Sequence, residues 1–291
     1  MSVSFVFWPI FIVENLDMRK IVFVTTFLFS FSVIHSQDSL TVSQIDTALT
    51  NEDSFVSKNE ARIYLQTGNN IVQLGRTLPS NAIYLRPSFM YYHKSGLYFG
   101  ANLTILPNEK KRPLDNFLLN VGYDKDLGKN FMTGIDYSYS HYFTSKQVSS
   151  SASHMIRPYI SWDNDYASPT FTPIISVGTS VDYSFQFDLT HIFTIRRIFS
   201  GRDKLTIPLI VGAIAGTSNY YTTYKKNNQL ASNSSTSKFA MTSIYFLATA
   251  KYRINRVSLS FNTSYYLSVD PTQTTTSSNT PFYKLTLCYY I

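Results

Sequence analysis

Short segments of alternating apolar and polar residues run through most of this 291-residue sequence, and they restrict its possible folds more than any other feature. A period of two is the period of a β-strand, whose successive side chains point to opposite faces. Between residues 97 and 105, the apolar residues Leu97, Phe99, Ala101, Leu103 and Ile105 alternate with Tyr98, Gly100, Asn102 and Thr104. The alternation continues to the last residue, Ile291, so we predict an all-β chain that ends inside a strand.

Segments of about ten residues with this period predict about twelve strands, an even number typical of single-chain bacterial barrels. We predict strands over residues 61–77, 82–93, 97–106, 115–124, 131–143, 154–162, 170–181, 184–195, 204–214, 238–252, 256–268 and 281–291. In the first predicted strand, the apolar residues before Gly68 and those after Asn70 would point to opposite faces, and a β-bulge between them would restore the alternation.

The lengths of the predicted connections alternate along the chain. Two short turns, Lys94 to Gly96 and Ile254 to Asn255, fall on one side, and the longer connections 107–113, 144–153, 217–238 and 270–280 fall on the other. Transmembrane barrels place short turns in the periplasm and long loops outside. The predicted turn Asp182–Tyr183 and the connection 196–203 fit this rule less well.

Aromatic residues are abundant, with 22 Tyr and 22 Phe, and many stand near strand ends. Aromatic girdles at the two membrane interfaces have this placement. We predict a lipid-facing girdle of Tyr91, Phe143, Trp162, Phe193, Tyr252, Tyr265 and Tyr289. The predicted fold is an all-β transmembrane antiparallel β-barrel. The alternative is a soluble secreted β-barrel that binds a small apolar ligand, because its strands also alternate.

The N-terminal region has the order of an export signal. Residues 18–36 combine Arg19 and Lys20 with an apolar run and predict a cleaved signal peptide. The run is too short for a transmembrane helix. We therefore interpret residues 1–17 as a mis-annotated start extension, 37–60 as a periplasmic segment and 61–291 as the barrel. The segment 38–60 could form a short helix, a partial plug or a disordered leader. The predicted location is the outer membrane of a Gram-negative bacterium.

The stretch Tyr91-Tyr92-His93-Lys94-Ser95-Gly96-Leu97-Tyr98 supplies a resemblance, together with Gln37 after the signal and the terminal strand ending at Ile291. With these features the chain resembles a group of uncharacterised outer-membrane β-barrel proteins of Bacteroidota. The resemblance implies a fold and a location and lends no chemistry. Outer-membrane lipid and the barrel-insertion machinery are the partners expected of such a protein.

The alternation also predicts which side chains face the lumen. They are Arg86, Arg157, Lys251, Lys284, Asp124, Asp136, Asp188, Tyr84, Tyr159 and Tyr245. If His141 faces His154 across a loop, Asp136 and Arg157 become diagonal neighbours and can form an ion pair. Large tyrosines in a barrel of this size favour a constricted lumen. The lumen residues would serve either structural packing or the passage of a small solute.

Several functional classes have little support. No run of five basic residues argues for nucleic-acid binding, and Cys288 is alone, which excludes an intrachain disulfide. No motif for a cofactor or for hydrolysis is present. His141 and His154 are weak candidates for a metal site, and a membrane-embedded hydrolase is the enzymatic alternative. We expect no cofactor, and either a structural or surface protein or a narrow passive pore.

Overall fold

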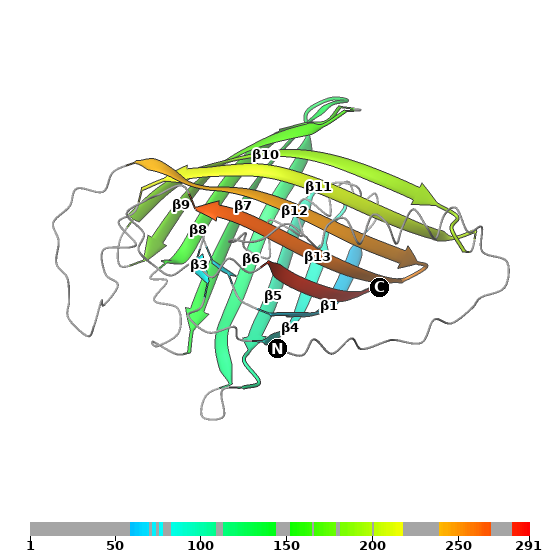
Figure 1. Cartoon of the computed structure of the whole chain (residues 1–291), viewed down its shortest axis with the longest axis horizontal. Coiled ribbons are helices and arrows are strands. Elements are labelled where there is room, and N and C mark those ends of the chain that lie inside the picture. The colour runs from blue at the N-terminus through cyan, green and yellow to red at the C-terminus, as the bar shows by residue number, and fades with distance from the viewer. Residues whose placement is uncertain are drawn as a thin grey trace, which may run out of the picture. The chain divides into compact units, whose positions relative to one another are not determined.

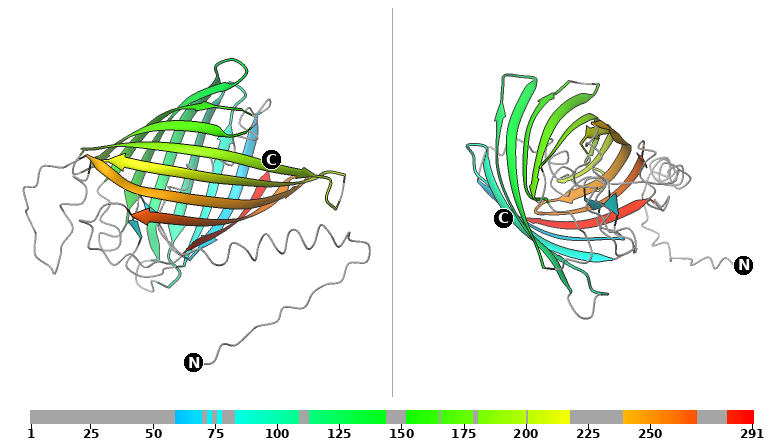
Figure 2. Two further views of the ribbon diagram at one scale, coloured as in Figure 1. Left: turned by 45° about the horizontal axis from the view of Figure 1, so that its top comes forward. Right: turned by 90° about the vertical axis from the view of Figure 1, so that its left-hand side faces the viewer.

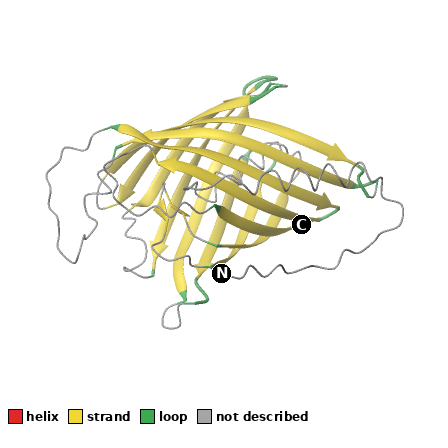
Figure 3. Ribbon diagram, in the orientation of Figure 1, coloured by secondary structure: helices red, strands yellow, loops and turns green. Residues whose placement is uncertain are grey.

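The structure is a computed structural model, and it describes residues 59–69, 72–73, 76–77, 83–108, 113–143, 152–164, 166–178, 181–199, 201–217, 239–268 and 281–291. The predicted start extension 1–17, the signal peptide 18–36 and the segment 37–60, except its last two residues, lie outside these ranges. All the regular elements in the described ranges are strands (Figure 3). In this part of the chain, no helix is long and apolar enough to cross a membrane.

Twelve strands close into one antiparallel barrel (Figure 1). They are β1 (Glu60–Gly68), β4 (Tyr84–Tyr92), β5 (Leu97–Ile105), β6 (Leu114–Asp126), β7 (Phe131–Tyr142), β8 (Ala152–Trp162), β9 (Ser168–Gly178), β10 (Val181–Arg196), β11 (Asp203–Gly216), β12 (Ala240–Ile254), β13 (Val257–Ser268) and β14 (Phe282–Tyr290). Strand β1 pairs with both β4 and β14, which closes the ring seen in Figure 2. Closure leaves no exposed strand edge. The predicted fold class is therefore confirmed.

The first predicted strand is wrong in its extent. Strand β1 ends at Gly68, and β2 (Val72–Gln73) and β3 (Arg76–Thr77) form a separate two-stranded sheet. No bulge repairs the phase. The residues after Gly68 are out of phase with Ile63 and Leu65, so a continuous strand would turn apolar side chains toward the polar lumen. Ending the strand avoids that placement.

The connections divide the barrel into two different ends. Residues 93–96, 127–130, 163–167, 197–202 and 255–256 join strands at what we call the short-turn end. Residues 69–83, 106–113, 143–151, 179–180, 217–239 and 269–281 connect strands at the opposite end. Apart from 179–180, the connections at the opposite end are the longer ones, as in transmembrane barrels.

Two predicted turns need correction. The tight turn after β12 is Asn255–Arg256, one residue later than predicted, and Asn255 has φ of 52°. Asparagine adopts this left-handed conformation more readily than most residues. Asp182 and Tyr183 lie inside β10, not in a turn. The turn at Gly96 is where the sequence placed it, with φ of 94°.

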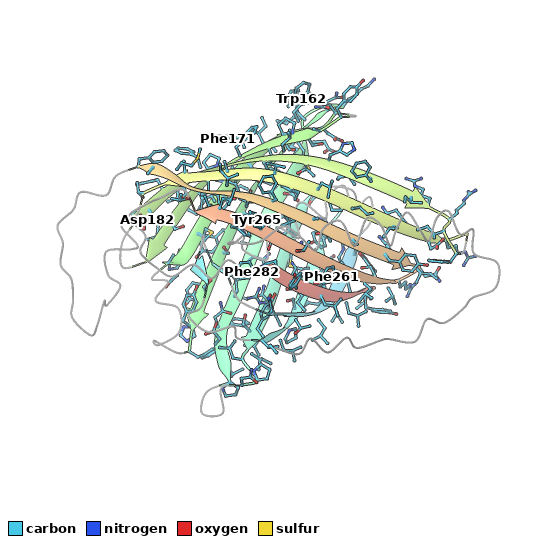
Figure 4. All side chains as sticks on the ribbon, viewed as in Figure 1. Trp162, Phe171, Asp182, Phe261, Tyr265 and Phe282 are labelled. Carbon is cyan, nitrogen blue, oxygen red and sulfur yellow. The ribbon has the colours of Figure 1, made fainter. Side chains whose placement is uncertain are left out.

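The two faces of the barrel wall differ in polarity. On β13, Phe261 on the outer face is 42% exposed, whereas the neighbouring Asn262 on the inner face is 2% exposed. On β14, Tyr283, Leu285, Leu287 and Tyr289 are exposed while Lys284 and Thr286 are buried. Figure 4 shows the side chains on the strands, with the outward-facing Phe171 and Phe261 labelled. An apolar exterior around a polar interior suits a barrel whose outer surface contacts lipid.

Candidate functional site in the barrel lumen

A buried ion pair crosses β7 and β8 inside the lumen. Asp136 lies directly opposite Arg157, and Arg157 Nε donates to Asp136 Oδ1 at 2.8 Å. The two residues are only 6% and 4% exposed. The register places Tyr139 opposite His154, so the predicted pairing of His141 with His154 is wrong by two residues. Asp136 and Arg157 are consequently direct cross-strand partners and not diagonal neighbours.

Four lumen tyrosines lie over glycines on the neighbouring strand. The pairs are Tyr84 with Gly68, Tyr98 with Gly122, Tyr159 with Gly134 and Tyr245 with Gly212, each directly opposite in the register. A Cβ atom added at any of these glycines would overlap the tyrosine ring. The missing side chain therefore lets each ring lie against the barrel wall.

Three of these rings reach across the glycine to an aspartate one strand further on. The rows are Tyr98, Gly122 and Asp136 on β5, β6 and β7; Tyr159, Gly134 and Asp124 on β8, β7 and β6; and Tyr245, Gly212 and Asp188 on β12, β11 and β10. The Tyr159 hydroxyl donates to Asp124 Oδ1 at 2.7 Å, and the Tyr98 hydroxyl is 3.4 Å from Asp136 Oδ2. The Tyr245 hydroxyl donates to Asp188, and Gln186 Nε2 donates to the same carboxylate at 2.7 Å. Each row thus fixes a carboxylate and a ring in one arrangement.

A series of basic side chains follows the lumen wall at the short-turn end. Arg196, Lys204 and Arg253 are consecutive register partners on β10, β11 and β12, and we call these three residues the basic arc. The Arg253 guanidinium lies 3.9 Å from the centroid of the Tyr290 ring on β14. Arg62 on β1 also packs on Tyr290, at 5.2 Å, and on Tyr92, at 4.4 Å. This layer lies at the ends of the strands, and Arg62, Arg196, Lys204 and Arg253 were not among the predicted lumen residues.

The remaining predicted lumen residues also occupy inward positions in the alternation. Arg86 is buried, donates to Thr104 Oγ1 at 2.9 Å and stacks over Tyr84 at 5.1 Å. Lys284 is buried opposite Gly68 and Asn262. Lys251 is half-buried between Thr206 and Ser260.

The predicted girdle residues are distributed over both ends of the barrel. Tyr91, Trp162, Phe193, Tyr252 and Tyr289 lie toward the short-turn end, whereas Phe143 and Tyr265 lie toward the other end. Trp162 is labelled close to the turns in Figure 4, and its ring stacks on Phe131 at 6.2 Å. The Tyr252 hydroxyl donates to Asp203 Oδ2 at 3.0 Å. An aromatic body with a polar tip suits the membrane interface.

The histidines of the described strands lie on the outer face. The His154 ring is 2.8 Å from the Tyr137 hydroxyl through Nδ1, and His141 packs edge-on against Phe143 at 5.0 Å. His191 packs against Phe193 at 4.4 Å. Among the residues that the structure describes, no group of three or more His, Cys, Asp or Glu side chains could hold a metal ion.

The chain forms a closed ring of twelve strands with an apolar exterior and a polar lumen. Its connections are short at one end of the barrel and mostly longer at the other. The architecture is that of an outer-membrane β-barrel. Barrels of this kind have a polar interior that is either a water-filled channel or filled by a plug. A soluble barrel with an apolar ligand would show the reverse polarity, with its apolar side chains inside.

Comparison with known proteins gives only distant structural likeness. No family model matches the sequence, and no curated protein matches it. Among solved structures, a KdgM porin is 9% identical with a TM-score of 0.45, covering 78% of this chain and 98% of its own. A NanC porin is 11% identical with a TM-score of 0.45, covering 78% and 97%. LpxR from Salmonella typhimurium is 9% identical with a TM-score of 0.42, covering 78% and 99%. The assignment of the fold rests on the strand pairing and not on these likenesses.

Proposed function

We propose that this barrel is a narrow passive pore for small solutes. Twelve strands about 4.8 Å apart and tilted by about 40° give a backbone diameter of about 24 Å. Tyrosine rings that pointed to the axis would fill much of that width. The observation that carries the proposal is that Tyr84, Tyr98, Tyr159 and Tyr245 instead lie over glycines of the wall. Rings placed in this way occupy less of the lumen than rings pointing to the axis would.

A membrane-embedded hydrolase has less support. Such an enzyme needs a base within hydrogen-bond reach of a nucleophile. His141 and His154 pack with aromatic residues on the outer face. His93 does approach the Ser95 hydroxyl at 2.8 Å, but the Ser95 amide donates to the same ring nitrogen at 3.2 Å. That contact closes a turn of four residues, 93–96, and supports a structural role for His93.

The biogenesis of the pore follows from the same proposal. We infer export through a cleaved signal peptide at residues 18–36, insertion by the barrel-insertion machinery and residence in a Gram-negative outer membrane. Membership of the Bacteroidota barrel group is part of this proposal and rests on the turn from Tyr91 to Tyr98.

The direct test is conductance in planar lipid bilayers. Purified protein that migrates as a folded barrel on an unheated gel is expected to give discrete channel events. Heat-denatured protein from the same preparation serves as the control. A folded barrel that inserts and gives no channel events would leave the structural role as the function.

A glycine substitution tests whether the lumen stays open because the tyrosine rings lie against the barrel wall. Gly212→Ala is expected to lower the single-channel conductance, because the new Cβ displaces the Tyr245 ring toward the axis. It should also lower the free energy of unfolding by about 1–3 kcal/mol, as overpacking does. The measurements are single-channel current and urea unfolding.

Two control variants make this result specific. Gly201→Ala lies in a turn where an added Cβ meets nothing within 4 Å, and it should change neither quantity. The double variant Gly212→Ala/Tyr245→Ala removes the displaced ring and should restore the conductance. An unchanged conductance in the single Gly212 variant would contradict the role given to the ring.

A further inference from the structure

Two neighbouring turns at the short-turn end concentrate positive charge on one side of the barrel. The turns are 197–202, between β10 and β11, and 255–256, between β12 and β13. They are adjacent because Asp203, after the first turn, is the register partner of Ile254, before the second. With the strand ends that flank them, residues 196–204 and 253–256 carry six basic side chains and one acidic side chain. This region therefore has a net charge of +5.

Two of the basic side chains, Arg197 and Arg256, lie in the turns themselves and are exposed. We call them the turn arginines. The Arg197 amide donates to the Asp203 carbonyl at 3.0 Å, so the backbone of Arg197 is two strand spacings, about 10 Å, from Ile254. The second turn begins at the residue after Ile254. The turn arginines are thus close enough to contact the same or neighbouring lipid headgroups.

The one acidic side chain of this region, Asp203, is turned into the barrel wall. It is 3% exposed, and its Oδ2 accepts hydrogen bonds from the Tyr252 hydroxyl at 3.0 Å and from the amide of residue 199 at 2.7 Å. Arg202, Lys204 and Arg253 on the same strand ends also have contacts within the protein, and Asp203 is a suitable counter-charge for one of them. The net charge already includes this carboxylate, so such a pair leaves the total unchanged.

The carboxylates next to this region on the other strands do not cancel its charge. On β1, Glu60 pairs with Arg62, and the pair is neutral. On β14, the Tyr290 amide donates to the Arg256 carbonyl at 2.9 Å, which places residue 291 near the second turn. A terminal carboxylate at Ile291 would lower the net charge by one and leave it clearly positive.

The short turn before β9 is acidic, but it lies far from the turn arginines. Residues 163–167 include Asp163 and Asp165. Strand β10 pairs with β9 only as far as Thr190, which is opposite Ser168, and then continues to residue 196 with β11 alone (Figure 1). Six residues of strand span about 20 Å, which is about twice the Debye length at physiological salt. The potential at the turn arginines is therefore set by the basic region.

The apolar outer face of the barrel ends where these turns begin. Ile195 is the last outward apolar residue of β10 and is 43% exposed. Ile254 and Val257, on either side of the second turn, are 38% and 39% exposed. Phe199 is 66% exposed, and its ring packs edge-on against the girdle residue Tyr252 at 6.0 Å. Headgroups lie directly outside the hydrocarbon core, so the turn arginines stand at the level of the lipid phosphates.

From these observations we propose that the turn arginines, beside Phe199 and Tyr252, bind the headgroups of anionic phospholipids in the leaflet at the short-turn end. Arginine forms charge-assisted hydrogen bonds with phosphate groups, and a basic segment at a membrane surface attracts anionic lipid. The aromatic pair provides the apolar contact for the acyl chains below. The inference goes beyond the proposed pore function and does not depend on it, because the outer surface meets lipid whether or not the lumen conducts.

The test is fluorescence quenching by brominated lipids in vesicles of phosphatidylcholine and phosphatidylglycerol. The full-length chain with Trp8→Phe keeps Trp162 beside the acidic turn as its tryptophan reporter. A second chain, Trp8→Phe/Trp162→Phe/Phe199→Trp, places the reporter beside the turn arginines. The vesicle composition is constant, and bromine is carried on the acyl chains of either the glycerol lipid or the choline lipid. The ratio of the two quenching efficiencies measures local enrichment of the anionic lipid and cancels the depth of the reporter.

The ratio is expected to be about twofold or more higher for the reporter at position 199 than for Trp162, and raised salt should lower it. Arg197→Gln/Arg256→Gln in the second chain should bring the ratio down to that of Trp162. Both side chains are exposed, so folding should be unaffected, and migration on an unheated gel checks this. Lys94→Gln/Lys129→Gln is the matched control, because it removes two exposed positive charges from other short turns and should leave the ratio high.

Three results would overturn the lipid site. Equal ratios at the two reporters would show that anionic lipid does not gather beside the turn arginines, and would leave the basic region to an acidic partner. A high ratio that survives Arg197→Gln/Arg256→Gln would show that these side chains do not bind the headgroups. A ratio that falls equally in the lysine control would show that only the total charge of the barrel matters.

Discussion

Replacing Asp136 with alanine is expected to lower the free energy of unfolding of the barrel by about 3–5 kcal/mol. The loss arises because Arg157 would keep its charge in a site that is only 4% exposed, without the carboxylate to which its Nε donates at 2.8 Å. The Tyr98 hydroxyl, 3.4 Å from the same carboxylate, would lose its acceptor as well. Urea unfolding in lipid vesicles and the heating temperature that converts the folded gel band measure this loss.

The matched control for this prediction is Ser138→Ala, two residues further along the lumen face of β7. That change removes a small hydroxyl from a similar depth and should alter stability by less than about 1 kcal/mol. The double variant Asp136→Ala/Arg157→Ala should be less damaging than the sum of the single variants, because no unpaired charge remains. Additive losses would show that the two side chains do not depend on each other.

The fold could be predicted because successive residues of a membrane-barrel strand face lipid and lumen in turn, so apolar and polar residues alternate in the sequence. Phe261 and Asn262 are adjacent in the chain, and one faces lipid while the other faces the lumen. The extent of the first strand could not be predicted in the same way. The alternation of apolar and polar residues is interrupted after Gly68. A β-bulge could restore the alternation within one strand, or the strand could end, and either outcome keeps apolar side chains out of the lumen.

The site was predictable only in part, because contacts across strands depend on register. Asp136 and Arg157 could be assigned to the lumen from their alternation, but direct pairing required the register set across the 143–151 connection. The tyrosine and glycine rows need the same information, since Tyr245 meets Gly212 across the long connection 217–239.

Two members of the basic arc, Arg196 and Arg253, escaped prediction for a different reason. Arg196 and Arg253 each stand one residue beyond the predicted strand ends, where boundaries are least certain. In the structure, β10 and β12 extend to include them, and their side chains join the lumen layer at the mouth. Extending the alternation of β10 from Asp188 to Arg196 would have assigned Arg196 to the lumen.

A lysine on the outer face of β10 is expected to be far more damaging than a lysine one residue away on the inner face. Leu189 lies near the middle of β10 and is 43% exposed on the outside, whereas Thr190 is 5% exposed on the lumen side. Leu189→Lys should lower the free energy of unfolding in lipid by about 2–4 kcal/mol, because it places a charge in the hydrocarbon region. Thr190→Lys lies on the lumen face two residues from Asp188, and its charge can be stabilised there. Urea unfolding in vesicles measures the difference between the variants, and the membrane-fraction yield of each tests insertion. Equal stability of the two variants would mean that the outer face does not contact lipid, and a freely soluble Leu189→Lys protein would mean the same.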